Sequence, residues 1–150
     1  MNYLCHECGK KYEISNLSYK CECGGLLNLE FKKQPIDFDK TKASNNHSLW
    51  KYIDALPFNG DDVWKDITLG EGGTPLIKIG QDLFAKADYY MPTLSFKDRG
   101  AAVLISMAKK LGVDTVVADS SGNAGTAIAA YSARAGIKAH IFVGESTSEK

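Results

Sequence analysis

From residue 96 onward, apolar residues follow the spacing of two helices. In residues 96–112 they recur at intervals of three and four, which places them on one helix face. A second apolar face follows between residues 124 and 135, and a glycine stands after each helix where a C-terminal cap belongs. The predicted faces consist of Ala101, Leu104, Ile105, Ala108 and Leu111 in the first helix, and Ala124, Ala127, Ile128, Tyr131 and Ala135 in the second.

Two apolar runs flank the second of these helices and read as strands. The run at 115–120 is continuous, and in the run at 137–143 apolar residues alternate with polar ones. The pattern predicts a parallel βαβ unit, preceded by a helix, because crossover connections are right-handed and make the two strands neighbours. The fold class is therefore α/β.

The end of the sequence carries the signal of another helix. Ser146 and Glu149 have the spacing of a capping box, and a parallel sheet needs cover on both of its faces. Only one clear βαβ unit is present in the sequence. We therefore expect an apparently truncated chain, which is the N-terminal part of a larger α/β protein or is completed by a partner.

The earlier part of the chain divides into a small N-terminal unit and a linker. Residues 1–33 are too few to fold around an apolar core of their own, and residues 34–47 are polar and read as a linker. The α/β domain is expected over 48–150. At its start, Ser48 is positioned to cap a short helix that ends at Pro57, and runs at 76–79 and 83–86 are predicted to form a small hairpin.

Charge and composition narrow the function classes. Eighteen Lys and Arg balance 18 Asp and Glu, so the chain has no net positive field to attract nucleic acid or an anionic membrane. No apolar stretch is long enough to span a bilayer, and the N-terminus lacks the apolar core of a signal peptide. We expect a cytoplasmic protein that binds neither nucleic acid nor membrane.

All four cysteines fall within the first 23 residues, a grouping that favours a metal site over disulfides. Cys5 and Cys8 have the usual two-residue spacing of a zinc knuckle, and Cys21 and Cys23 form a tighter second knuckle before two glycines. Four thiolates complete the tetrahedral coordination of a zinc ion and leave no open position. The predicted zinc ribbon is therefore structural, and His6 is not a ligand. Zinc ribbons also bind nucleic acids, but residues 1–34 carry a net charge of only +1.

Lys97 is the first candidate for chemistry. Ser95 and Asp98 have capping-box spacing, which sets Lys97 in the first turn of the predicted helix. The helix dipole and the nearby Arg99 both disfavour its ammonium form, as a Schiff-base lysine requires. On this spacing alone, an ordinary solvated lysine remains the stronger interpretation.

The second candidate is the segment SSGNAGT at 120–126, between a parallel strand and a helix. Ligands of open α/β sheets bind at that edge, where free amides at the helix start hold anions. A plain strand-to-helix turn explains the segment about equally well. It lacks the lysine of a Walker loop, and GEGG at 70–73 is not a dinucleotide fingerprint because Pro75 takes the last glycine position.

Several of these segments resemble the threonine synthase family, within the fold type II group of pyridoxal-phosphate enzymes. The matching blocks are GEGGTPL at 70–76, PTLSFKDRG at 92–100 and SSGNAGTAIAAYSARAG at 120–136. A Cys-rich ribbon followed by a short Trp-containing helix, here SLWKYIDALPF, also occurs in members of that family. Two departures stand out: Leu94 occupies a position that is often small, and the family's phosphate loop and the partner of its pyridine nitrogen fall beyond residue 150.

The resemblance implies a cofactor, a set of site residues and a reaction. Lys97 would bond covalently to pyridoxal 5'-phosphate, and Asn123 would hydrogen-bond its ring hydroxyl. The substrate carboxylate would lie against Ser120, Ser121, Ala124, Gly125 and Thr126. The implied reaction is the lyase conversion of O-phospho-L-homoserine and water to L-threonine and phosphate, with this N-terminal fragment not necessarily active alone.

Alternatives remain open at this point. Other fold type II activities, such as cysteate synthase or an amino-acid dehydratase, use the same cofactor lysine on another small amino acid. A zinc-ribbon module that only mediates interaction is a rival of a different class. The sequence leaves open both a homodimer and a missing C-terminal half.

Overall fold

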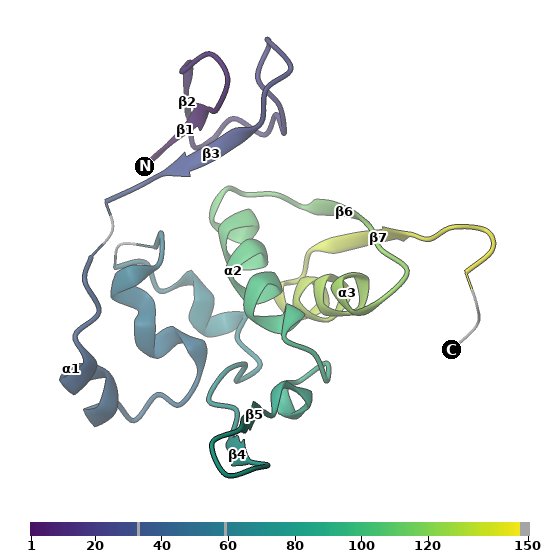
Figure 1. The fold of residues 1–150 in the computed structure, drawn as a ribbon. Coiled ribbons are helices and arrows are strands. Elements are labelled where there is room, and N and C mark those ends of the chain that lie inside the picture. Colours follow the sequence, from purple (N-terminus) through teal and green to yellow (C-terminus); the bar gives the residue numbers. More distant parts are fainter. Residues whose placement is uncertain (33, 59, 148–150) are drawn as a thin grey trace.

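The computed structural model describes residues 1–32, 34–58 and 60–147. Its first unit is a three-stranded antiparallel sheet of β1 (Asn2–Cys5), β2 (Lys11–Glu13) and β3 (Leu27–Glu30), in the order β2-β1-β3. Tyr3 of β1 pairs with Tyr12 on one side and with Leu29 on the other. Figure 1 shows this sheet at the end of the molecule where the chain begins, and its residue Tyr3 lines a pocket together with Leu104 and Met107 of the C-terminal half.

The polar segment after the sheet contains a short helix that the sequence did not predict. Helix α1 (Phe38–Ala43) begins after Asp37, whose carboxylate accepts the backbone N–H groups of Asp39 and Lys40 at 3.0 Å each. The N-terminal cap thus stabilises a helix in a segment that has no apolar periodicity. Polar composition alone was a poor guide to structure in this part of the predicted linker.

The Trp-containing segment forms a 3-10 helix, η1 (Leu49–Ala55), rather than a regular α-helix. The predicted cap is confirmed, since the Ser48 hydroxyl accepts the N–H of Trp50 at 3.2 Å. A kink at Tyr52 divides the element, and the helix is capped at Leu56, just before Pro57. Trp50 is buried and stacks at 4.9 Å on the ring of Trp64, which lies in a second 3-10 turn, η2 (Val63–Asp66).

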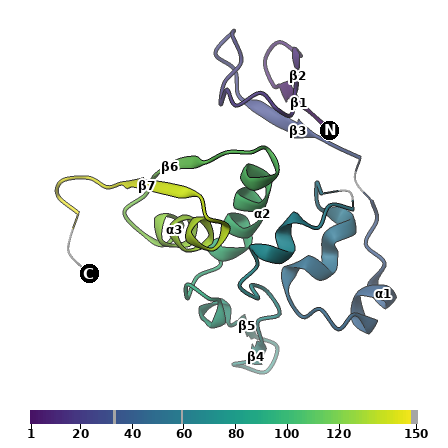
Figure 2. The ribbon, with the colours of Figure 1, turned by 180° about the vertical axis from the view of Figure 1, so that it is seen from behind.

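The predicted hairpin is also confirmed. Strands β4 (Leu76–Lys78) and β5 (Phe84–Lys86) pair antiparallel, with Ile77 opposite Ala85. A 3-10 turn, η3 (Asp88–Tyr90), connects the hairpin to the segment before the next helix. The hairpin lies on the opposite side of the helices from the N-terminal sheet (Figures 1 and 2).

The helix and the βαβ unit predicted from periodicity are present. They are α2 (Lys97–Lys110), β6 (Thr115–Asp119), α3 (Asn123–Ala135) and β7 (Lys138–Phe142). The two strands are parallel, with Val117 opposite His140, and Gly136 ends α3 in the left-handed conformation. The protein is thus a mixed α/β structure with a parallel strand pair. The further helix predicted from Ser146 and Glu149 lies outside the described residues.

Helix α3 packs against the β6–β7 pair, and α2 packs against α3 (Figures 1 and 2). Their contact buries Ala102 and Ile105 of α2 and Ala127 and Tyr131 of α3 completely. Leu104, predicted on the buried face of α2, is instead 58% exposed. On the opposite face of the strand pair, side chains such as Val117 and Phe142 are exposed to solvent.

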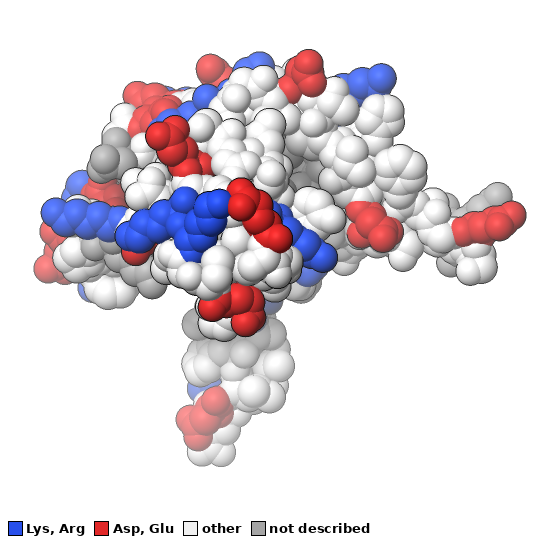
Figure 3. All heavy atoms as spheres, turned by 90° about the horizontal axis from the view of Figure 1, so that it is seen from above, with Lys and Arg blue, Asp and Glu red and all other residues white. Residues whose placement is uncertain are grey.

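Charged side chains of both signs are interspersed on the molecular surface. On the face that Figure 3 presents, a band of basic side chains lies among acidic ones, so neither sign covers the face alone. In the N-terminal sheet, Lys10 pairs with Glu22 at 2.7 Å and Lys11 with Glu30 at 2.9 Å. Across the part of the chain that the structure describes, no helix combines the length and apolar character that crossing a membrane requires.

Candidate functional site

Lys97 is the first residue of α2, in the helical turn where the sequence predicts it. Its side chain is exposed, and the Nζ atom lies 4.6 Å from the ring centroid of Phe96. The Ser95 hydroxyl accepts the backbone N–H of Lys97 at 3.3 Å. A primary amine therefore sits at the positive end of a helix and is accessible to a ligand.

The buried side chain of Asp98 fixes the start of α2. Its side chain is completely buried and accepts the backbone N–H of Thr93 at 2.7 Å, and it also accepts the Thr93 hydroxyl. The predicted capping box is therefore corrected: the carboxylate bonds to Thr93 rather than to Ser95, because the turn at 91–94 folds Thr93 back over the helix start. Sequence spacing identified the motif but not the partner.

Arg99 anchors the same turn from the other side. Its Nη2 atom lies 3.0 Å from Asp88 Oδ1 and 3.1 Å from Thr74 Oγ1, and the Thr74 hydroxyl donates to Asp88 at 2.8 Å. The Thr74 hydroxyl and the Arg99 guanidinium together lower the pKa of Asp88. The charge of Arg99 is thus compensated by Asp88 and does not act on Lys97 alone. Lys97 is thus followed by two residues of α2 whose side chains are anchored by hydrogen bonds.

Asp88→Asn is expected to lower the free energy of unfolding by about 1 kcal/mol at pH 7, because the charged hydrogen bonds to Arg99 and Thr74 weaken. The lowered pKa of Asp88 means that this stabilisation is present above the ordinary aspartate pKa and is lost as the pH falls through the lower folded-state value. Urea denaturation should therefore give a lower free energy of unfolding for Asp88→Asn than for wild type at pH 7, and nearly equal values for the two proteins at pH 2.5. Asp82→Asn, at an exposed site, is the control, and an equal deficit at both pH values would contradict the assignment.

The segment 120–126 lies where the sequence predicts it, between the carboxyl end of β6 and the start of α3. Asn123, Ser121 and Thr126 are exposed, whereas Gly125 is buried. A Cβ atom at Gly125 would lie 2.7 Å from the Ser120 carbonyl oxygen and 2.8 Å from Ile141 Cγ2. Glycine therefore admits the close approach of α3 to this turn and to β7, which places the exposed polar side chains at the helix start.

Glu71 of the GEGG segment is a residue that sequence reasoning passed over. Its carboxylate is completely buried and accepts the Tyr131 hydroxyl at 2.9 Å and the Leu69 N–H at 2.9 Å, together with the Trp50 indole N–H and the Thr68 hydroxyl. Burial and the nearby Glu71 charge raise the pKa of Tyr131, so its hydroxyl remains a donor. The carboxylate joins η1, the segment 68–71 and α3.

The glycines that follow Glu71 allow its segment to lie directly on the backbone of another. A Cβ atom at Gly72 would collide with the backbone at Leu49, and one at Gly73 with the carbonyl of His47. The Leu49 N–H donates to the Glu71 carbonyl at 2.7 Å across the same contact. The next residue, Thr74, reaches Arg99, so the Glu71 segment connects the core to the start of α2.

The four cysteines converge as predicted. Their sulfur atoms lie within 4.8 Å of one another, with Cys5 and Cys23 at 3.6 Å and Cys8 and Cys21 at 3.6 Å. Zn–S bonds of about 2.3 Å in a tetrahedron place sulfurs about 3.8 Å apart, so the geometry suits zinc. His6 is exposed and is not among the clustered ligands. The four residues could form a metal site.

Tyr12 of β2 lies beside this cluster. Its hydroxyl lies 3.0 Å from Cys21 Sγ and lowers the pKa of that thiol to about 6. The same hydroxyl accepts the Glu22 N–H at 3.3 Å. A hydrogen bond to a ligand sulfur is the kind of outer contact that orients metal ligands.

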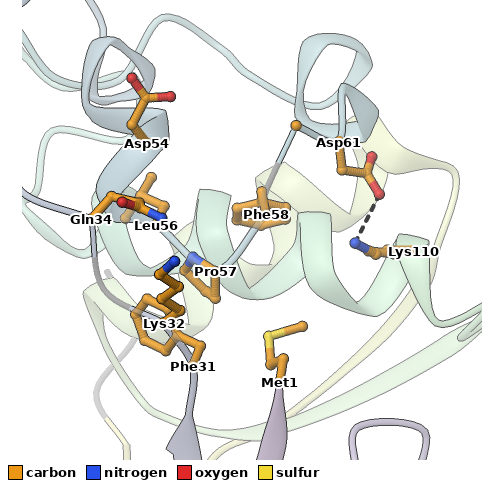
Figure 4. Close-up of a pocket in the computed structure, with 11 residues that line it drawn as sticks. Met1, Phe31, Lys32, Gln34, Asp54, Leu56, Pro57, Phe58, Asp61 and Lys110 are labelled. Atoms are coloured by element: carbon orange, nitrogen blue, oxygen red, sulfur yellow. Dashed lines mark ion pairs between the residues drawn. The ribbon is translucent and has the colours of Figure 1, made fainter.

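A hollow of about 490 Å³ lies away from these candidates, where the end of the N-terminal sheet meets η1 and the last turn of α2. Figure 4 shows Phe58 at this hollow, with the ion pair between Asp61 and Lys110 at 2.9 Å beside it. Lys110 is the last residue of α2 and Lys97 the first, so the length of the helix, about 20 Å, separates them. This hollow does not contain the predicted site residues.

Comparisons with known proteins give similarities over most of this chain. The family model described as "Pyridoxal-phosphate dependent enzyme" matches residues 67–150, which hold Glu71, Lys97 and the 120–126 segment. The chain is 37% identical over 155 residues to the threonine synthase of Methanocaldococcus jannaschii, an alignment that covers 94% of this chain and 37% of that protein. It is 40% identical over 149 residues to the threonine synthase of Methanosarcina acetivorans, covering 93% and 36%. The chain thus spans little more than a third of the length of these curated relatives.

Proposed function

Because this chain belongs to the family of pyridoxal-phosphate-dependent enzymes, we propose that it supplies the cofactor lysine and substrate-carboxylate segment of a threonine-synthase-like lyase. The observation that carries the proposal is Lys97: an exposed amine on the first turn of α2, in which the next two residues, Asp98 and Arg99, are anchored by hydrogen bonds to Thr93 and Asp88. A covalent cofactor site needs such a reachable amine on a rigid support.

The residues present fit pyridoxal phosphate. Lys97 offers the primary amine, and Asn123 offers an exposed side-chain amide for the ring hydroxyl. When bound, the cofactor supplies an electron sink for reactions at the α-carbon of an amino acid. The Lys97 amine would also be the group that accepts and returns protons at the substrate, because its position is set by the anchored helix start.

The substrate carboxylate is assigned to the start of α3. Ser121 and Thr126 present exposed hydroxyls there, and the first N–H groups of α3 face outward along the helix axis. The helix dipole favours an anion at this end. Ser120 and Ala124 flank the same turn. Gly125 lets α3 pack closely on β7, and this packing fixes the position of the turn.

The proposed reaction is the conversion of O-phospho-L-homoserine and water to L-threonine and phosphate. The likeness to the threonine synthases of two archaea over most of this chain supports this choice of substrate. The test is to supply the complete gene product with pyridoxal phosphate and O-phospho-L-homoserine and to measure phosphate and threonine. Equal release of both supports the proposal. Phosphate release without threonine, or no release, would reject this reaction.

We also propose that the four cysteines bind one structural zinc ion. The geometric fit of the sulfurs and the small size of the three-stranded sheet support this, because such a sheet has little apolar core of its own. A closed set of four thiolates has no open position for substrate, so the ion would stabilise the fold rather than act in the reaction.

Cys8→Ser is expected to abolish stoichiometric zinc binding and to expose residues 1–30 to proteolysis, because metal binding supplies folding free energy in small zinc units. His6→Ala is a matched control two residues away in the same knuckle, and it should keep one zinc ion per chain. Metal analysis by mass spectrometry and limited proteolysis measure both. Loss of zinc in the His6 variant, or its retention in the Cys8 variant, would contradict the assigned ligands.

A further inference from the structure

Leu94 has a backbone conformation that its own side chain disfavours. Its φ is 61°, and among the described residues it is the only one other than glycine with a positive φ. In this left-handed region the Cβ atom crowds the following carbonyl, so glycine is the preferred residue. A leucine retained at such a position requires a compensating benefit.

The surrounding structure forces this conformation on Leu94. Its N–H donates to the Met91 carbonyl at 2.8 Å, which closes the turn at 91–94. Thr93 is held twice by the buried carboxylate of Asp98. Helix α2 begins three residues after Leu94, so the backbone at Leu94 is fixed on both sides.

Packing within this structure does not compensate for the strain. The Leu94 side chain is 73% exposed, so it gains little from burial. Glycine would satisfy the turn without strain and without an exposed apolar group. The benefit must therefore come from a contact that the side chain makes with something outside the described structure.

The position of Leu94 indicates what that contact is. Leu94 lies three residues before Lys97, at the end of the turn that leads into α2, and the Phe96 ring between them, 58% exposed, lies against the Lys97 amine. Building on the function proposed above, we propose that Leu94 is a specificity-determining residue that contacts the aliphatic carbon chain of the amino acid bound at Lys97. An apolar side chain at this place favours substrates with a longer carbon chain over shorter ones.

The test uses the complete gene product loaded with pyridoxal phosphate and compares wild type with Leu94→Gly and Leu94→Ala. Binding of L-2-aminobutyrate and of glycine is measured by the thermal shift each produces. We expect wild type to bind L-2-aminobutyrate about tenfold more tightly than glycine, and both variants to lose most of that preference. Leu83→Ala changes an exposed leucine in the hairpin connection and should leave the preference for L-2-aminobutyrate over glycine unchanged.

The melting temperature without amino acid gives a second, independent readout. Leu94→Gly should raise it by about 2 °C because the backbone strain is removed, whereas Leu94→Ala should not. A lower melting temperature in Leu94→Gly would mean that the side chain packs against protein, and would overturn the proposal. So would an unchanged preference in both variants, or none in wild type.

Turnover of O-phospho-L-homoserine by the wild type tests the proposed reaction separately. A wild-type protein that shows the chain-length preference but no turnover would reject the reaction and retain the role of Leu94. A protein that turns over the substrate while its Leu94 variants keep the wild-type preference would support the reaction and reject the role of Leu94.

Discussion

Lys97→Ala in the complete gene product is expected to reduce turnover by roughly 10³-fold or more, because it removes the amine that we propose holds the cofactor and moves the protons. Lys97→Arg should be as inactive, since a guanidinium stays protonated and cannot serve as a nucleophile. The thermal stability of both variants without cofactor should match wild type, because the side chain is exposed and its contact is with the equally exposed Phe96. Steady-state kinetics and thermal denaturation measure the two effects.

A matched lysine serves as the control for this experiment. Lys78 is exposed and also lies over an aromatic ring, that of Phe84 at 6.0 Å, but on the β4–β5 hairpin. Lys78→Ala should therefore keep near wild-type turnover. Residual activity of Lys97→Ala within tenfold of wild type would exclude Lys97 as the cofactor lysine.

Glu71→Gln is expected to destabilise the protein by about 2–4 kcal/mol, the largest stability effect of a conservative change here. The buried carboxylate accepts hydrogen bonds on both oxygens, from Trp50 on one and from Tyr131 and Leu69 on the other. A glutamine would turn one oxygen into an NH₂ group, which faces the Leu69 N–H in one orientation of the amide and the Trp50 indole N–H in the other. The Tyr131 hydroxyl can rotate to accept, but neither of these N–H groups can.

Urea denaturation measures this effect as a lower midpoint. Glu145→Gln, the same change at an exposed position, should leave the midpoint unchanged. Tyr131→Phe should cost less than Glu71→Gln, because it removes one donor and leaves the others in place. A Glu71→Gln variant as stable as wild type would mean that the carboxylate does not hold these segments together.

Local periodicity was sufficient to predict the C-terminal half of the described fold. Helices α2 and α3 and the strands between and after them follow from apolar spacing and from glycines at the helix ends. The hairpin and the Ser48 cap were also predictable, because turn residues and capping side chains act over a few residues. Helix α1 was missed because its cap lies in a polar stretch without an apolar face.

The contacts that define the candidate site could not be predicted in the same way. Glu71 joins residues 21 and 60 positions away along the chain, and nothing in its local sequence distinguishes it from a solvated glutamate. The spacing of Ser95 and Asp98 predicted a capping box, but Asp98 bonds to Thr93 instead. The strained turn at Leu94 brings Thr93 to the start of the helix. Long-range hydrogen bonds and backbone strain are properties of the folded chain, so a single sequence carries no periodic signal for them.

The most direct measurement of cofactor attachment is reduction of the complete gene product with borohydride in the presence of pyridoxal phosphate, followed by peptide mapping. Reduction makes a lysine–cofactor linkage permanent, so the modified residue can be identified by mass spectrometry. We predict one modified site, Lys97, and its disappearance in Lys97→Ala. Modification concentrated at another lysine, or spread evenly over the exposed lysines with Lys97 no more labelled than Lys78, would contradict the assignment of Lys97 as the cofactor lysine.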